Sequence, residues 1–133
     1  MLGRLHAILW QYDPAPLEVF LGGFTSLWGL WVLLPWAPAT FAVGPAFRGP
    51  VATGIPEEVW GAVACGLGVL RLWAVAGDVR RVRARLSLGA FVFWLIVSWS
   101  LVTNAFTGTG TPIYPWVALA CLGVYLRLAR AGL

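Results

Sequence analysis

The sequence predicts an all-α integral membrane protein, a four-helix bundle made of two tandem helical hairpins with a short N-terminal interfacial helix. Three observations predict it. Of the 133 residues, 60% are hydrophobic and only 11% are charged, and the mean hydropathy is +0.83, which is far above the soluble range. Four apolar stretches approach the roughly 20 residues that cross a hydrocarbon layer of ~30 Å. The charged residues gather mainly at the ends of these stretches.

The four predicted spans cover residues 17–36, 57–77, 86–106 and 112–130, within one transmembrane domain over residues 17–133. Hydrocarbon offers the backbone no hydrogen-bonding partner, so apolar segments of this length are expected to be helices. The connection over residues 36–56 is rich in Pro and Gly. We expect no regular helix there, and we expect its apolar side chains to fold over the helix ends.

Residues 1–16 predict an amphipathic helix that lies in the membrane interface. Its leucines share one side of a helical wheel, and Arg4 and Gln11 lie on the other. The run DPAP at residues 13–16 is expected to end this helix.

Arginine supplies every basic residue apart from one histidine, and its distribution predicts the orientation. The connection between the second and third spans holds a basic cluster of four, Arg80, Arg81, Arg83 and Arg85. Segments on this side of the membrane carry seven arginines, and those on the other side carry one, Arg48. The arginine-rich side is expected to be cytoplasmic, with both termini, in a bacterial inner membrane. Topology alone accounts for these arginines, so no direct nucleic-acid binding is expected, although binding of anionic lipid headgroups or an acidic partner stays open.

Tryptophans near the span ends are typical of side chains that anchor a helix at the membrane interface. The residues expected to act as interfacial anchors are Trp10, Trp36, Trp60, Trp73 and Trp116.

A duplication relates the second and fourth spans. At an offset of 56, eight of 17 positions are identical, including the pairs Trp60/Trp116, Cys65/Cys121 and Arg71/Arg127. Apolar composition alone does not readily produce identical Trp, Cys and Arg positions. We therefore interpret the chain as two hairpins of like orientation.

Arg71 lies roughly 9 Å inside the end of the second span by helical rise. A guanidinium at this depth needs a partner or must extend to the headgroups. Glu18, at the matching end of the first span, is the candidate partner in an intramembrane ion pair, and extension to the headgroups is the alternative. Small residues in these two spans, among them Gly22, Gly29 and Gly61, favour close packing of the helices.

The sequence shows no convergent set of catalytic residues and no metal-ligand spacing. We expect no catalytic, cofactor-binding or metal-binding residues, no cofactor, and no enzyme activity. Cys65 and Cys121 are expected to be small packing residues.

The stretch from Glu58 to Leu128 carries EVWGAV, LRL followed by the basic cluster, LGAFVFW and IYPWVALACLGVYLRL. In these elements it resembles small polytopic membrane proteins encoded in tailed bacteriophage genomes. The resemblance implies a protein of the host inner membrane or the virion that acts in genome entry or in holin-like lysis.

Two functional classes are therefore expected first. One is a non-enzymatic phage membrane or virion component, and the other is an accessory structural subunit of a bacterial membrane complex. A small transporter or channel is a weaker alternative, because no ionisable residue is predicted at mid-membrane. The expected partners are membrane lipids and either further copies of the chain or other membrane proteins.

Overall fold

The computed structural model describes residues 2–4, 7, 11–34, 47–104, 106, 108 and 110–132. This part of the chain is all-helical, with residues 2–4 in a helical turn and without strands. Its labelled helices are α2 (Ala15–Leu33), α4 (Arg48–Ala52), α5 (Glu57–Ala76), α6 (Arg80–Asn104) and α7 (Tyr114–Arg130). Three of them, α2, α5 and α6, are long and apolar enough to cross a membrane. Most of the predicted N-terminal helix lies outside the described residues.

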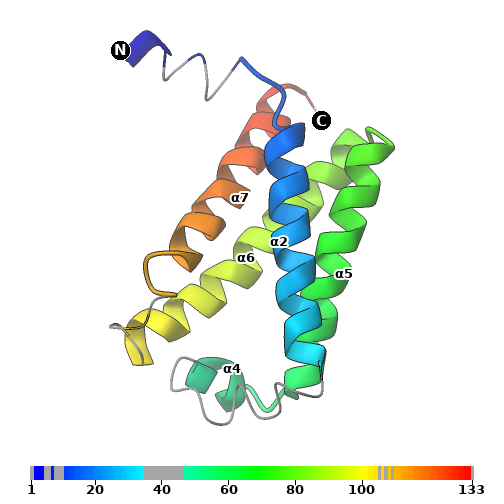
Figure 1. Cartoon of the computed structure of the whole chain (residues 1–133). Coiled ribbons are helices and arrows are strands. Elements are labelled where there is room, and N and C mark those ends of the chain that lie inside the picture. Colours follow the sequence, from blue (N-terminus) through cyan, green and yellow to red (C-terminus); the bar gives the residue numbers. More distant parts are fainter. Residues whose placement is uncertain are drawn as a thin grey trace.

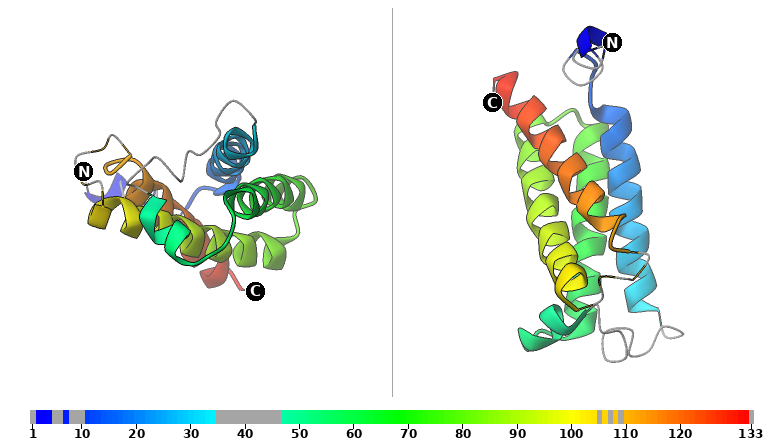
Figure 2. Two further views of the ribbon diagram at one scale, coloured as in Figure 1. Left: turned by 90° about the horizontal axis from the view of Figure 1, so that it is seen from below. Right: turned by 90° about the vertical axis from the view of Figure 1, so that its left-hand side faces the viewer.

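The long helices alternate in direction along the chain (Figure 1). The start of α2, the turn from α5 to α6 and the end of α7 therefore meet at one end of the molecule, called here the arginine end. Helix α4 lies at the other end, the α4 end. The closest packing joins α2 to α5 and α6 to α7, and these two pairs are seen side by side in Figure 2.

Proline sets both limits of α2. The helix begins after Pro14, and the carboxylate of Asp13 accepts a hydrogen bond from the Ala15 N–H (2.9 Å), which satisfies a backbone donor of the first turn. It ends at Leu33 because Leu34 precedes a proline and takes an extended conformation with ψ 140°. Helix α2 therefore begins two residues before the predicted span of 17–36 and ends three residues before the end of that span.

The basic cluster lies in a helix and not in the predicted connection over 78–85. Only Gly77, Asp78 and Val79 separate α5 from α6. Asp78 makes the turn with φ 47°, a left-handed conformation that aspartate adopts more readily than most residues. Helix α6 begins at Arg80, six residues before the predicted start at residue 86, which is less than two turns of helix. It presents its arginines on different faces.

A short helix, α4, occupies part of the segment for which we expected none. Pro50 fits because it lies in the first turn, where the backbone N–H groups have no helical partner in any case. The Gly49 N–H donates a hydrogen bond to Ser100 Oγ (3.0 Å), and Phe47 packs against Trp28 with ring centroids 6.3 Å apart. The described part of this segment thus covers the helix ends as expected.

Glycines allow α2 and α5 to touch through their backbones. A Cβ on Gly29 would lie 2.4 Å from the Cys65 nitrogen and 2.5 Å from the Gly61 oxygen. A Cβ on Gly68 would lie 2.5 Å from the Gly22 oxygen. Because backbone atoms cannot move aside as a side chain can, this contact requires glycine. The predicted close packing of small residues is confirmed as a contact within the chain.

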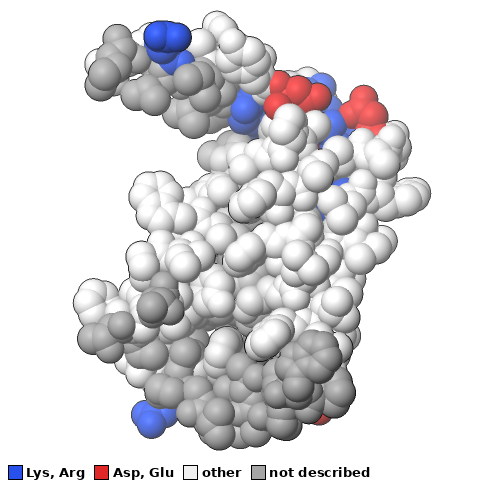
Figure 3. All heavy atoms as spheres, viewed as in Figure 1, with Lys and Arg blue, Asp and Glu red and all other residues white. Residues whose placement is uncertain are grey.

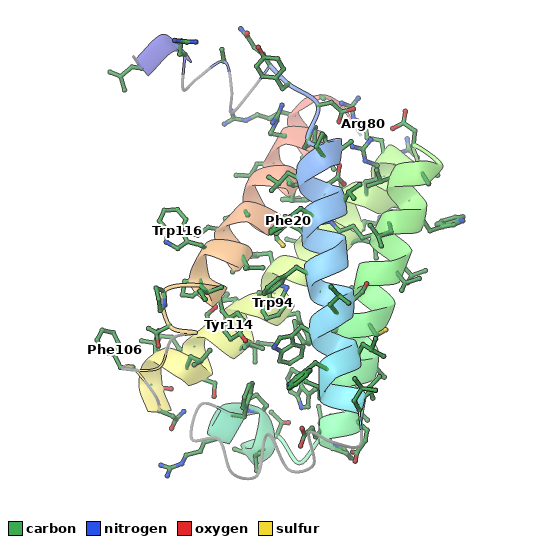
Figure 4. All side chains as sticks on the ribbon, viewed as in Figure 1. Phe20, Arg80, Trp94, Phe106, Tyr114 and Trp116 are labelled. Carbon is green, nitrogen blue, oxygen red and sulfur yellow. The ribbon has the colours of Figure 1, made fainter. Side chains whose placement is uncertain are left out.

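Aromatic rings fill the space between the two helix pairs in the half of the molecule nearer α4. Trp94 is completely buried, stacks on Tyr114 with centroids 5.2 Å apart and meets Trp28 edge-on at 5.3 Å. Its indole N–H donates to Thr25 Oγ1 (3.1 Å). Figure 4 shows Trp94 and Tyr114 between α2 and the α6–α7 pair, with Phe106 and Trp116 pointing outward.

The glycine contact predicts a position-specific effect of added methyl groups. Gly29→Ala should lower the stability of the detergent-solubilised protein by about 1–3 kcal/mol, because α2 and α5 must separate. Gly23→Ala, on the same helix, has open space at the Cβ position and should leave stability unchanged or raise it through helix propensity. Thermal unfolding followed by circular dichroism measures both, and equal effects of the two substitutions would contradict the backbone contact.

Candidate functional site

Charged side chains gather at the two ends of the molecule and leave a band of uncharged surface between them (Figure 3). The arginine end holds most of them, and it also holds a buried cluster of ionised groups. This cluster and the cavity beside it are the candidate functional site.

Glu18, in the first turn of α2, is buried completely and pairs with Arg83 in the first turn of α6. The Arg83 Nε donates to both carboxylate oxygens of Glu18, at 3.1 and 3.3 Å, and Nη2 contacts the nearer oxygen as well. A bidentate arginine–carboxylate pair of this kind has a fixed relative orientation. It therefore fixes α2 against α6, and so joins the two helix pairs.

Two aspartates complete the shell of Arg83. Its Nη1 donates to Asp78 (2.6 Å) in the α5–α6 turn, and its Nη2 donates to Asp13 (3.2 Å) just before α2. The hydrogen bond from the Ala15 N–H and the one from Arg83 lower the pKa of Asp13 below its ordinary value. Because its pKa is lowered, this carboxylate stabilises the fold when the pH is above the ordinary pKa of aspartate. The contribution is lost as the pH falls through the lowered pKa.

The predicted ion pair between Glu18 and Arg71 is wrong, because Glu18 pairs with Arg83 instead. Arg83 takes that place because α6 starts earlier than expected and turns Arg83 inward, where it is only 4% exposed. The spacing of Arg83, Ser87, Ala90 and Trp94 follows one helical face, and all four are buried. If the helix is taken to start at residue 80, as α6 does, this spacing in the sequence predicts that Arg83 faces inward.

Arg71 is buried without a carboxylate. It is 1% exposed, and its Nη1 donates to Cys121 Sγ at 3.4 Å. Its Nε and Nη2 have no hydrogen-bond partner among the described residues. Extension to the headgroups, the predicted alternative, does not occur either, since the guanidinium stays inside. A buried guanidinium with unmade hydrogen bonds costs stability.

The remaining members of the basic cluster stay on the surface. Arg80, Arg81 and Arg85 are exposed, and Arg80 Nη1 donates to the backbone oxygen of Ala131 beyond the end of α7 (3.3 Å). The cluster predicted as one unit is thus divided into a buried residue, Arg83, and three exposed ones.

A cavity of about 750 Å³ opens at the arginine end, beside the Arg83 cluster. It lies where the start of α6 meets the end of α7, and residues 11–14 form part of its wall. Four arginines line it: Arg80, Arg83, Arg127 and Arg130. The meeting of the two arginine groups around one space could not be predicted, because Arg80 and Arg127 are 47 residues apart and only the packing of α6 on α7 brings them together.

The tryptophans expected as interfacial anchors differ in their exposure. Trp73 and Trp116 are exposed on the surface, at 62% and 71%, as an interfacial side chain must be. Trp60 is only 8% exposed and packs on Phe93 with ring centroids 5.9 Å apart, so its predicted role as an anchor is wrong. Trp10 and Trp36 lie outside the described residues.

Within the described residues, no three His, Cys, Asp or Glu side chains are grouped so that they could hold a metal ion. Both cysteines are free thiols, and Cys121 is buried. Comparisons with protein-family models, with curated proteins and with solved structures give no match to this chain.

The two buried arginines should respond in opposite ways to replacement by an apolar residue of similar length. Arg83→Met leaves the Glu18 carboxylate buried without a cation and should lower stability by about 3–5 kcal/mol. Arg71→Met removes a guanidinium with unmade hydrogen bonds and should leave stability unchanged or raise it. Thermal unfolding in detergent checks both variants. A loss for Arg71→Met as large as that for Arg83→Met would contradict this division of roles.

Proposed function

We propose that the protein is a non-enzymatic polytopic membrane protein in which α2, α5, α6 and α7 cross the bilayer as a four-helix bundle. The observation that carries the proposal is the exposed surface between the two charged ends. Over residues 19–29 of α2, 61–72 of α5, 86–100 of α6 and 117–126 of α7, every exposed side chain is apolar. The exposed large side chains of this band include Leu27, Val69, Leu70, Val92, Leu95, Ile96 and Leu119.

The helix lengths support the proposal. Helix α5, with 20 residues, is about 30 Å long, which matches the hydrocarbon layer. Helix α6 is longer, and its first turns carry the arginines beyond that layer. Helix α7 has 17 residues and is about 25 Å long. Arg127 and Arg130, in its last turn, would extend to the headgroups as arginines at span ends do.

The positions of the arginines support a cytoplasmic arginine end. The basic residues of α6 and those of the α7 terminus lie at that end of the molecule, and Arg48 of α4 lies at the other. The arginine-rich side of a membrane protein usually stays in the cytoplasm. With this orientation, residues 11–14 and 131–132 face the cytoplasm. Exposed Trp73 lies near the inner interface, and exposed Trp99 and Trp116 lie near the outer one.

The apolar surface favours a structural role over a pore. A pore between copies of the chain needs a polar face to line it, and the band of described residues offers none. Among the phage functions expected from the sequence, we therefore propose a component acting in genome entry, in the host inner membrane or the virion, in preference to a holin-like lysis factor. An accessory subunit of a bacterial membrane complex is the second candidate, because an apolar helix face suits a partner helix as well as lipid. Presence of the chain in purified virions would separate the first from the second.

Expression of the chain alone in bacterial cells tests the structural role. The protein should stay in the membrane fraction after an alkaline carbonate wash, and the cells should keep their membrane potential and exclude impermeant dyes. A matched variant with a polar stripe on the lipid face, Leu119→Gln/Leu126→Gln, controls for the effect of surface polarity on insertion. Lysis or dye entry on expression of the unaltered chain would contradict the proposal.

A further inference from the structure

We propose that the cavity at the arginine end binds the phosphate headgroup of an anionic phospholipid. The proposal rests on the membrane position argued above and adds a specific ligand to it. Its basis is the meeting of the basic residues of α6 with those of α7 around one space of about 750 Å³.

Charge balance makes the cavity cationic. Three carboxylates, those of Glu18, Asp13 and Asp78, are bound to the single guanidinium of Arg83. Arg80, Arg127 and Arg130 add three positive charges to the lining. All three carboxylates form their salt bridges with Arg83, and none of them forms one with Arg80 or Arg127. A phosphodiester carries one negative charge, and guanidinium groups such as those of Arg80 and Arg127 bind it by charge-assisted hydrogen bonds.

The arginines also supply geometry. Arg80 reaches the space from the first turn of α6, and Arg127 from the last turn of α7. Arg80 is already directed toward the end of α7 by its contact with the Ala131 oxygen. Guanidinium groups on two sides of a phosphate can each donate two parallel hydrogen bonds to its oxygens. Arg83, by contrast, is occupied by its carboxylates and shapes the wall of the cavity.

The position of the cavity selects a lipid as the source of the phosphate. It lies at the level where α7 leaves the proposed membrane, and Leu128, a buried core residue, lines it beside the arginines. A lipid presents a charged headgroup and an apolar glycerol-linked portion at this same depth. The inner leaflet is also the one rich in anionic lipids. The cavity size is within the range of small-ligand sites.

Thermal unfolding of the full chain in an uncharged detergent tests the site. Phosphatidylglycerol should raise the unfolding midpoint in a saturable way, whereas phosphatidylcholine and inorganic phosphate should not. In Arg80→Gln/Arg127→Gln the lipid concentration needed for half the shift should rise ~10-fold or more, as expected for losing charge-assisted hydrogen bonds. The unfolding midpoint without lipid shows whether the variant folds, and Arg130→Gln alone serves as a milder second variant.

The matched control is Arg81→Gln/Arg85→Gln. It removes the same charge from the same end of the molecule, but neither residue lines the cavity. It should keep the half-shift concentration of the unaltered chain. Equal weakening in both double variants, no shift with phosphatidylglycerol, or an equal shift with inorganic phosphate would each overturn the lipid site. A chain that stays monodisperse in buffer without detergent would instead overturn the membrane proposal.

Discussion

The ion pair between Glu18 and Arg83 is the contact on which the arrangement of the helices depends. Within each hairpin the helices are held by close packing, through glycines in α2 and α5. Between the hairpins, the half nearer α4 is filled by aromatic rings, whereas the half nearer the arginine end is held by charges. Because Glu18 is completely buried, its carboxylate requires a cation at hydrogen-bond distance. That requirement fixes α6 against α2, and with it the turn at Asp78, which supplies a further carboxylate.

The same contact creates the conditions for the cavity. Arg83 binds Asp13 and Asp78 directly, and neither carboxylate forms a salt bridge with Arg80 or Arg127. Positive charge accumulates on the other side of the space as a result. The structural ion pair and the proposed lipid site thus have one origin. The carboxylates bind Arg83, and the other three arginines of the cavity are left to line it.

The identical residues of the second and fourth spans do not have equal environments. Trp60 lies in the core and its counterpart Trp116 is exposed, while Arg71 is buried and its counterpart Arg127 lines the cavity. The α6–α7 hairpin therefore turns a different face of the repeated helix outward. Cys121, in α7, meets Arg71, in α5, so that the repeated Arg and Cys contact each other across the repeat.

Hydropathy and length are sufficient to locate the long helices, because a stretch of about 20 apolar residues has few structures available to it. The close contact of α2 with α5 could also be predicted, since it depends on residue size alone. The cation of the ion pair could not be predicted. The choice between Arg71 and Arg83 depends on where α6 starts, and the charged residues at its start made that segment look like a connection. The burial of Trp60 was likewise hidden, since a tryptophan near a helix end has the same sequence signature whether it faces lipid or a neighbouring ring. The cavity could not be predicted either, because it forms only where α6 packs on α7.

Site-specific labelling of the chain in intact spheroplasts tests the central claim, that the helices cross the membrane with the arginine end inside. In a background of Cys65→Ser and Cys121→Ala, a single cysteine is placed at Arg48 or at Arg81, both exposed, and treated with a membrane-impermeant maleimide. We expect Arg48→Cys to be labelled from outside and Arg81→Cys to be labelled only after the membrane is opened. Labelling of Arg81→Cys in intact spheroplasts would contradict it.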